Sequence, residues 1–354
     1  MRVLAALSGG VDSSVAAALL LEEGHDVVGV TMKLWGGESD TGCCAVSDVE
    51  DARRAAAQLG VEHHVFNFGE EFERHVVDPY VADHLAGRTP NPCVECNRHL
   101  KFDALLRRAE VLGFDAVATG HHARVVTSTD GHRYVARGAD SAKDQSYVLH
   151  PLRSEQLERV RLPVGRHTKA EVRRIAAELG LRTAAKPDSQ DVCFVTRSAG
   201  RGAFLAQRAE LRPGVVVDEE GRVLGDVEAV ELVTIGQRRG LELAGGSGRR
   251  FVLDVDVDTA TVTVGPPERL LRDEVRVDGV VWAGEPVEGR VRAQTSAHGE
   301  PAAADVRLDA DGTVTVRWEE PRRRVAPGQS VVLYRDVATE DGPVEVVVGG
   351  GLAR

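Results

Sequence analysis

A glycine-rich loop near the N-terminus decides more about the fold of this chain than any other segment. The loop, S-G-G-V-D-S-S at residues 8–14, follows an apolar run at residues 3–7 that predicts a buried strand. A helical pattern at residues 13–23, closed by Gly24, comes after it. Backbone N–H groups in such a loop and the positive end of the helix favour a phosphate, although a tight glycine turn with a serine cap is the competing interpretation. Strand, loop and helix in this order predict an α/β domain.

The loop matches neither of the two common phosphate-binding patterns. No lysine follows its glycines, as in G-x-x-x-x-G-K-[ST], and its spacing differs from that of G-x-G-x-x-G. A loop without a lysine for the terminal phosphate suits a pyrophosphate leaving group. Asp12 is then the candidate for contact with Mg²⁺.

Helical segments alternate with apolar strand-like segments through the first half of the chain. The predicted strands are residues 27–32, 61–68 and 116–119, and the predicted helices are residues 49–59, 102–112 and 168–180. This alternation is typical of a doubly wound parallel sheet that is covered on both faces and binds ligands at the carboxyl ends of its strands.

The pattern changes to short alternating strands after residue 204. Residues 251–264 and 306–318 have the form of β-hairpins, and Pro266-Pro267 is a plausible break between units. We therefore predict three domains, at residues 1–204, 205–267 and 268–354, of which the last two are small β domains.

The composition is that of an ordinary soluble globular protein, with 42% hydrophobic and 28% charged residues. The net charge of -11 excludes a general attraction to nucleic acid, so any such binding must use a local basic surface. Ser8 interrupts the first apolar run too early for a secretion signal, and the run at residues 15–21 is far shorter than the roughly 20 residues that span a bilayer. We expect a cytoplasmic protein with no membrane partner.

The five cysteines indicate metal binding or sulfur chemistry, because an odd number in a reducing cytosol does not suggest a disulfide scaffold. Two proline-containing segments hold three of them and are predicted to be loops. Cys93 and Cys96 lie in residues 90–97, and Cys193 lies in residues 186–194.

Basic residues near these cysteines predict lowered thiol pKa values and attack as thiolates. They are Arg98, Lys101 and Lys186. For any single cysteine the competing interpretation is a small buried hydrophobe, and this interpretation is kept for Cys43 and Cys44.

A series of motifs resembles those of one known family. The form S-G-G-x-D-S is similar to the loop of the ATP pyrophosphatase (PP-loop) superfamily, whose members adenylate a carbonyl oxygen and then displace AMP with a nucleophile. The chain as a whole resembles the tRNA-specific 2-thiouridylase family. The motifs that carry this resemblance are T-P-N-P at 89–92, C-N at 96–97, K-F at 101–102, T-G-H at 119–121, K-D-Q-S-Y at 143–147, K-P-D-S-Q-D at 186–191, C-F at 193–194, T-I-G-Q-R at 234–238 and G-G-G at 349–351.

The resemblance implies an adenine nucleotide alpha hydrolase-like PP-loop domain, then a central β domain and a C-terminal β-barrel. It implies that ATP, with Mg²⁺, adenylates the C2 oxygen of the wobble uridine in tRNAs of the lysine, glutamate and glutamine type. Sulfur then arrives from an upstream persulfide donor, a cysteine desulfurase or a relay protein. Cys96 would be the nucleophile and Cys193 the persulfide carrier, and the two would form a transient disulfide.

The same resemblance assigns binding residues. The implied ATP contacts are Ala6, Leu7, Ser8, Gly9, Gly10, Val11, Asp12, Ser13, Met32 and Gly120. The implied tRNA contacts are His121, Lys143, Asp144, Gln145 and, from the final barrel, Gln329.

Simpler interpretations exist for several of these residues. Lys143-Asp144-Gln145 has the composition of a solvated polar turn, and Gln329 follows a Pro-Gly pair that predicts a turn. The pair His121-His122 fits packing or hydrogen bonding as well as function. The arginines at 322–324 form either a solvated charge run or a phosphate contact, and the second would make tRNA binding depend steeply on salt.

One departure from the family opens a second sulfur route. Many members carry Asp where this chain has Cys93, so an acid or base role for that Asp is in doubt here. The change creates C-x-x-C, and with Cys193 it offers three thiolates to an iron-sulfur cluster with one open iron for sulfide. A zinc site that adds Cys43 or Cys44 is weaker, because adjacent cysteines chelate one tetrahedral ion poorly.

Two functions outside tRNA thiolation also fit part of the pattern. The glycine loop alone allows a small-molecule adenylating synthetase, of the amidating or argininosuccinate type, that does not need Cys96 or Cys193. A non-catalytic ATP-binding tRNA chaperone would likewise tolerate Cys96→Ser.

Overall fold

A five-stranded parallel sheet forms the N-terminal part of the protein. The computed structural model describes residues 1–35, 46–188, 192–195, 200–243 and 249–354. The strand order is β3-β2-β1-β4-β7. The strands are β1 (Arg2–Ala6), β2 (Asp26–Lys33), β3 (His63–Asn67), β4 (Ala116–Ala118) and β7 (Val160–Arg161).

Helices cover both faces of this sheet. Val3 and Ala5 pack with α1 (Val11–Glu22) and α2 (Val46–Leu59), whereas Leu4, from the opposite face, packs with α6 (Leu105–Val111). Successive residues of a strand point to opposite faces, so the continuous apolar run is explained by burial on both sides. The predicted doubly wound sheet is confirmed. The helix α8 (Lys169–Glu178), packed on α1, confirms the helix predicted at residues 168–180 and begins with a capping box between Thr168 and Glu171.

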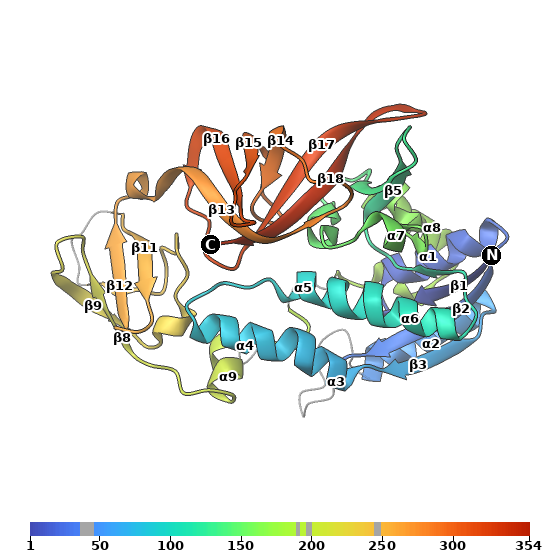
Figure 1. Ribbon diagram of the computed structural model, residues 1–354. Helices are drawn as coiled ribbons and strands as arrows, with labels where there is room; N and C mark the ends of the chain where they lie inside the picture. Colours follow the sequence, from blue (N-terminus) through green and yellow to red (C-terminus); the bar gives the residue numbers. More distant parts are fainter. Residues whose placement is uncertain (36–45, 189–191, 196–199, 244–248) are drawn as a thin grey trace.

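The prediction of a loop over residues 90–97 is wrong. A continuous helical stretch runs through α5 (Pro92–Glu95), a π-helical segment η2 (Cys96–Ala104) and α6 (Figure 1). Asn91 caps its start, because its side-chain oxygen accepts the Cys93 N–H at 3.1 Å, and Pro92 takes the first helical position, where no N–H is needed. Both cysteines of the C-x-x-C pair are therefore on a helix.

A second helical stretch packs against this one. It consists of α3 (Gly69–Phe72), the π-helical segment η1 (Glu73–Val77) and α4 (Asp78–Leu85). The remaining short helices are η3 (Ser146–Leu149), α7 (Ser154–Leu157), η4 (Pro163–Arg166), η5 (Arg182–Ala185), α9 (Gly200–Ala206), η6 (Val230–Leu232) and η7 (Pro267–Leu270). None of the helices in the described ranges is both long enough and apolar enough to cross a membrane.

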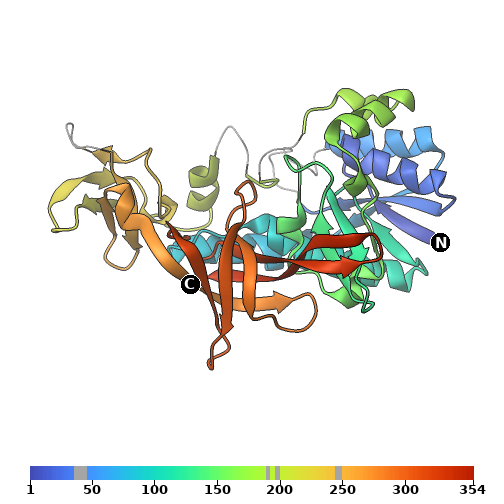
Figure 2. The same cartoon turned by 90° about the horizontal axis from the view of Figure 1, so that it is seen from above.

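A separate five-stranded sheet follows, in the order β10-β9-β8-β12-β11. Its strands are β8 (Gly214–Val217), β9 (Val223–Val227), β10 (Glu242–Leu243), β11 (Phe251–Asp256) and β12 (Thr261–Gly265). The last two form the hairpin predicted at residues 251–264. Figure 2 shows this sheet at the end of the molecule opposite the N-terminus.

The C-terminal region is a closed, six-stranded antiparallel β-barrel. The strand order is β13-β16-β15-β14-β17-β18, and a pairing of β18 with β13 closes it. The strands are β13 (Leu271–Trp282), β14 (Gly289–Gln294), β15 (Ala302–Leu308), β16 (Val314–Arg323), β17 (Ser330–Thr339) and β18 (Gly342–Ala353). The predicted barrel and its hairpin at residues 306–318 are confirmed.

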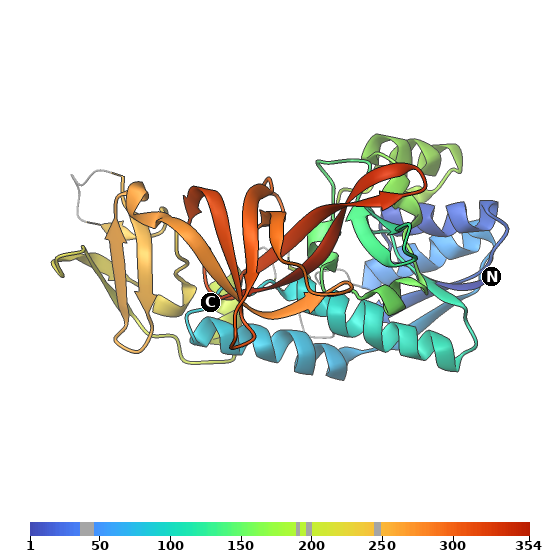
Figure 3. The ribbon, with the colours of Figure 1, turned by 45° about the horizontal axis from the view of Figure 1, so that its top comes forward.

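Two strands of the N-terminal region join the sheet of the barrel. The hairpin β5 (Ala123–Thr127) and β6 (Arg133–Arg137) pairs with β18, where Ala136 lies opposite Val346. Figure 3 shows the long β17–β18 hairpin reaching over to this pair. This connection fixes the barrel beside the parallel sheet, and it was not predicted.

Candidate active site

The glycine loop follows β1 and begins α1, at the carboxyl edge of the parallel sheet. Gly9 has φ +71°, and a Cβ there would lie 2.3 Å from the Asp48 carbonyl oxygen, so only glycine fits. The Ser8 N–H donates to Ser13 Oγ at 3.1 Å, and Ser13 Oγ donates to the Gly10 carbonyl oxygen at 3.2 Å. These bonds hold the loop in shape around the start of α1, which Gly10 caps without a side chain.

Gly120 presses against the loop from the neighbouring strand. It follows β4, which pairs with β1, and a Cβ at Gly120 would lie 2.6 Å from Ser13 N and 2.7 Å from the Asp12 carbonyl carbon. The loop and the T-G-H segment therefore meet at the edge where ligands bind in such sheets. This close approach of backbone to backbone is possible because residue 120 is a glycine.

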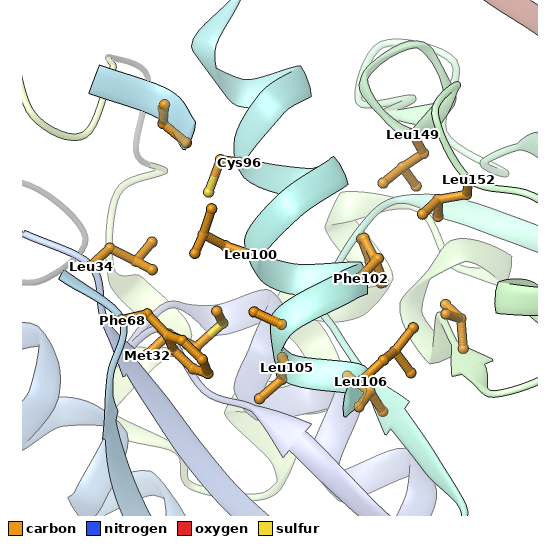
Figure 4. Close-up of a cluster of buried hydrophobic side chains, with 14 of the residues drawn as sticks. Met32, Leu34, Phe68, Cys96, Leu100, Phe102, Leu105, Leu106, Leu149 and Leu152 are labelled. Atoms are coloured by element: carbon orange, nitrogen blue, oxygen red, sulfur yellow. The ribbon is translucent and has the colours of Figure 1, made fainter. Parts of the chain in front are cut away.

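The other predicted ATP residues lie around the same edge. Ala6 ends β1, Leu7 is buried after it, and Met32 is buried near the end of β2. Met32 and Cys96 belong to one hydrophobic cluster, and Figure 4 shows the helix of Cys96 lying over Met32, Leu34 and Phe68. Cys96, the predicted nucleophile, and Met32, a predicted ATP contact, thus belong to the same hydrophobic cluster.

Asp12, in the first turn of α1, is held by a lysine and a histidine. Lys169 Nζ lies 2.7 Å from each of its carboxylate oxygens, and His122 Nε2 lies 3.0 Å from Oδ1. Burial disfavours the charged carboxylate, but these two partners outweigh burial and lower its pKa below the ordinary 3.8. The Asp12 carboxylate therefore stays negatively charged in the glycine loop.

Lys169 is a functional candidate that the sequence reasoning missed. It is only 9% exposed and begins α8, where the helix dipole disfavours a cation. A lysine in the first turn of a capped helix was the available signal. Its Nζ also lies 2.9 Å from Asp188 Oδ1, so Lys169 joins the loop to the K-P-D motif.

The K-P-D motif is held in place by ion pairs at both of its charged residues. Lys186 Nζ lies 2.7 Å from carboxylate oxygens of Asp48 and Asp51 on α2. Asp188 pairs with Lys143 at 2.8 Å and with Arg173 at 2.9 Å. The segment that leads to Cys193 is thereby fastened to α2 and α8.

The ion pairs of Asp188 should make stability depend on pH. Hydrogen bonds from Lys143 and Lys169 outweigh burial and lower the pKa of Asp188 below the ordinary value of 3.8. A lowered folded-state pKa gives stability that is complete well above 3.8 and declines as the pH falls through and below that value. The advantage of the wild type over Asp188→Asn should be about 2 kcal/mol at neutral pH. It should shrink by about 1 kcal/mol at pH 3.

Urea unfolding of both proteins between pH 3 and pH 7 measures this difference. Asp341→Asn is the matched control, because Asp341 is exposed in the turn between β17 and β18. A constant difference between wild type and Asp188→Asn across this range would contradict the assignment.

The three described cysteines are thiols in three different environments. Cys93 is exposed, Cys96 is buried and Cys193 is half-buried. Desolvation by the surrounding protein raises the pKa of the Cys93 thiol, against the effect of Lys101. The expected lowering of thiol pKa values is therefore wrong for Cys93. Two of the basic residues behind that expectation are engaged elsewhere, Lys186 with Asp48 and Asp51, and Arg98 with Glu95.

The structure does not assemble a metal site from these cysteines. Among the described residues, no group of three or more His, Cys, Asp or Glu side chains is arranged to hold a metal ion. The residues present therefore do not fit a cluster in this conformation. Cys43 and Cys44, considered for zinc, lie outside the described residues.

Phe194 anchors the segment of Cys193. Its buried ring lies between 5.0 and 6.2 Å from the rings of Phe204, Tyr80, Phe72 and Trp35. Aromatic contacts of this kind stabilise a position beyond the burial of area. Cys193 consequently packs against the same hydrophobic cluster that contains Cys96.

The predicted tRNA contacts occupy several environments. Lys143 pairs with Asp188 as above, and Asp144 accepts from Arg137 Nη1 and the Gly138 N–H, both at 2.8 Å. Gln145 Oε1 accepts the His122 N–H at 2.8 Å. Lys143, Asp144 and Gln145 thus order the loop around the Asp12 partner His122.

His121 and Gln329 make contacts of a different kind. His121 is buried with Nδ1 2.7 Å from Thr119 Oγ1, and burial together with Lys101 keeps its pKa well below 6.5. Gln329, after β16, donates from Nε2 to the Thr89 carbonyl oxygen. The barrel therefore touches the segment that leads into the cysteine helix.

Known protein families match nearly the whole chain. Family models match residues 1–197 (tRNA methyl transferase HUP domain), residues 202–266 (tRNA methyl transferase PRC-barrel domain) and residues 272–352 (aminomethyltransferase beta-barrel domain). The tRNA-specific 2-thiouridylase MnmA of Chloroflexus aurantiacus is 46% identical over 361 residues, covering 100% of this chain and 98% of that protein.

Further similarities were found among curated and solved proteins. The tRNA-specific 2-thiouridylase MnmA of Renibacterium salmoninarum is 46% identical over 355 residues, covering 95% of this chain and 94% of the relative. The crystal structure of a 4-thiouridine synthetase–RNA complex with bound ATP is 22% identical with a TM-score of 0.38, over 55% of this chain and 44% of that chain.

Proposed function

The chain belongs to the tRNA-specific 2-thiouridylase family, and we propose on this basis that it replaces the C2 oxygen of the wobble uridine of tRNA with sulfur. ATP-dependent 2-thiolation of a tRNA uridine makes it a sulfurtransferase. The single observation that carries the proposal is that a phosphate cradle and a buried thiol share one core. Met32 and Cys96 lie in one cluster beside the sheet edge that carries the glycine loop at residues 8–14, which is the phosphate cradle of this proposal.

ATP binds at the glycine loop in this proposal. The backbone N–H groups of the glycine loop and the start of α1 suit the phosphates and stabilise the departing pyrophosphate, and the close backbone contacts at Gly9 and Gly120 hold this loop in shape. The side chain of Asp12 is 30% exposed, which fits contact with Mg²⁺ that arrives on the nucleotide. Lys169 contacts both oxygens of Asp12 and has to release one of them for that contact.

Sulfur transfer uses the two cysteines in sequence. The C2 oxygen of uridine attacks the α-phosphorus of ATP, and pyrophosphate leaves. The terminal sulfur of a Cys193 persulfide then attacks C2. The Cys96 thiolate attacks Cys193 Sγ, which breaks the persulfide bond, leaves the sulfur on C2 and expels AMP. A Cys96–Cys193 disulfide remains, and two electrons are needed to reopen it.

The tRNA is held by local basic surface on an acidic protein. Arg272, Arg276 and Arg323 line a cavity of about 290 Å³ on the barrel, beside Trp318. Phosphate contacts there would position the tRNA without reading its sequence, so affinity should fall steeply with salt. We assign Lys143, Asp144, Gln145, His121 and Gln329 to tRNA binding. Two contacts support this role: Gln145 accepts the His122 N–H, and Gln329 donates to the Thr89 carbonyl oxygen.

The same proposal covers the setting of the reaction. The catalytic domain is residues 1–204, and the units at residues 205–267 and 268–354 support tRNA binding. The upstream persulfide comes from a cysteine desulfurase or a relay protein in the cytoplasm, and the favoured tRNAs are those for lysine, glutamate and glutamine.

Nucleoside mass analysis tests the function directly. A tRNA with a wobble uridine is incubated with the purified protein, Mg-ATP, a sulfide source and reductant, and ATP is omitted in the control. The expected result is 2-thiouridine only with ATP. ATP cleavage that requires an amino acid or a free nucleotide, with no thiolated tRNA, would instead support a small-molecule synthetase.

A further inference from the structure

The three cysteines differ in their access to solvent, and this difference bears on how the enzyme is reset. Cys96 is 7% exposed and Cys193 is half-buried against the same cluster, whereas Cys93 is exposed. The disulfide left between Cys96 and Cys193, if the proposed function holds, would form on a buried sulfur. A reductant must reach a sulfur atom in line with the disulfide bond, so burial slows direct reduction.

Cys93 stands one helical turn before Cys96 on the same helix. Residues three apart on a helix face the same way, with Cβ atoms about 5–6 Å apart. A disulfide needs about 3.5–4.5 Å, so a small local adjustment is required. The winding changes from α to π at Cys96, so the regular helical geometry is interrupted between the two cysteines, where such an adjustment can occur.

We propose that Cys93 is a resolving thiol that carries reducing equivalents from solvent to Cys96. The Cys93 thiolate attacks Cys96 Sγ, a Cys93–Cys96 bond forms, and Cys193 leaves as a thiolate ready for a new persulfide. A dithiol reductant then attacks the exposed Cys93 sulfur and, through a second exchange, leaves as a disulfide. Two electrons pass from the dithiol to the enzyme, and no further oxidant is involved.

The surroundings of Cys93 suit this order of events. Cys93 is exposed, so a reductant in solvent reaches its sulfur, and the pKa of its thiol is raised by desolvation on the side that packs against the protein. Lys101 acts against that effect, and because only the thiolate attacks, the exchange should become faster as the pH rises and more thiolate forms.

Trapping after a single turnover identifies the disulfide. Wild type and Cys93→Ser, each loaded with persulfide, react once with tRNA and ATP without reductant, and free thiols are then alkylated for peptide mass analysis. The wild type should contain Cys93–Cys96 and the variant Cys96–Cys193. A wild type that accumulates only Cys96–Cys193 would overturn the proposal.

Steady-state turnover with a protein dithiol as reductant separates recycling from chemistry. Cys93→Ser should form the first equivalent of 2-thiouridine at the wild-type rate, within about twofold, and then turn over at least about tenfold more slowly. Loss of the first turnover in the variant would place Cys93 in the thiolation step and refute a purely resolving role.

Failure of the proposed function is recognised separately. If the wild type makes no 2-thiouridine in the first turnover, the function fails, and the cysteine pair is tested on its own in Cys193→Ser protein equilibrated with oxidised dithiothreitol. A Cys93–Cys96 disulfide in that protein supports the pair as a redox couple. Its absence, with both thiols fully alkylated, overturns the resolving role.

Discussion

Cys96→Ser is expected to lower 2-thiouridine formation by about 1,000-fold or more, because a serine hydroxyl stays protonated at neutral pH and does not attack a persulfide. The tRNA affinity should stay within about threefold, since the substituted side chain is buried and away from the surface. Nucleoside mass analysis measures the product, and filter binding measures affinity. Cys96→Ala serves as a second variant, because it removes the thiol without burying a hydroxyl.

Cys193→Ser should fail at an earlier step. The variant should adenylate tRNA, seen as pyrophosphate release, but should carry no persulfide at residue 193 after incubation with the sulfur donor. Cys96→Ser should still carry it. Thiolation by either variant at more than a few per cent of the wild-type rate would show that the assigned roles are wrong.

Gly120→Ala should slow the reaction with ATP strongly, although the substitution adds only one methyl group. The added Cβ would lie 2.6 Å from Ser13 N and 2.9 Å from Ser13 Cα, and these backbone atoms have no other conformation to adopt cheaply. We expect the loop to shift, kcat/KM for ATP to fall by about 100-fold, and the free energy of unfolding to fall by about 2 kcal/mol. Pyrophosphate release at varied ATP concentration and urea unfolding measure these effects.

Gly284→Ala is the matched control for that substitution. A Cβ at Gly284 would lie 3.4 Å from the Tyr134 hydroxyl, an ordinary contact, and far from the loop in sequence and in fold. The control should keep both ATP kinetics and stability near wild type. Wild-type kinetics in Gly120→Ala would mean that the cradle does not bind the phosphates.

The N-terminal sheet and the β-hairpins of the C-terminal region were predictable because their signals are local, whereas the closed barrel was expected only from the family resemblance. The glycine loop, the apolar strands and the Thr168 capping box each require only a few adjacent residues. The helix over Cys93 was missed although its signal was also local. Asn91-Pro92 suggested a loop because of the proline, whereas an asparagine cap before a proline at the first helical position is equally a helix start.

The charged network of the site was beyond sequence reasoning for a different reason. Asp12, Lys169 and Asp188 are separated by long stretches of chain, and nothing in their order indicates that α8 packs beside α1. Only Lys169 carried a hint, as a cation in a first helical turn. The different solvent exposure of Cys93, Cys96 and Cys193 likewise results from tertiary packing. The sequence pattern predicted a loop for each of them and did not distinguish them.

The last strand of the chain has a bearing on how the protein is made. β18 closes the barrel against β13 and also pairs with β6, a strand from the N-terminal region. During synthesis the β5–β6 hairpin and the open edges of β13 and β17 must wait for the final residues to leave the ribosome. Unpaired strand edges invite pairing with other chains. A chain truncated before β18 would therefore be expected to aggregate, and not merely to lack a folded C-terminal domain.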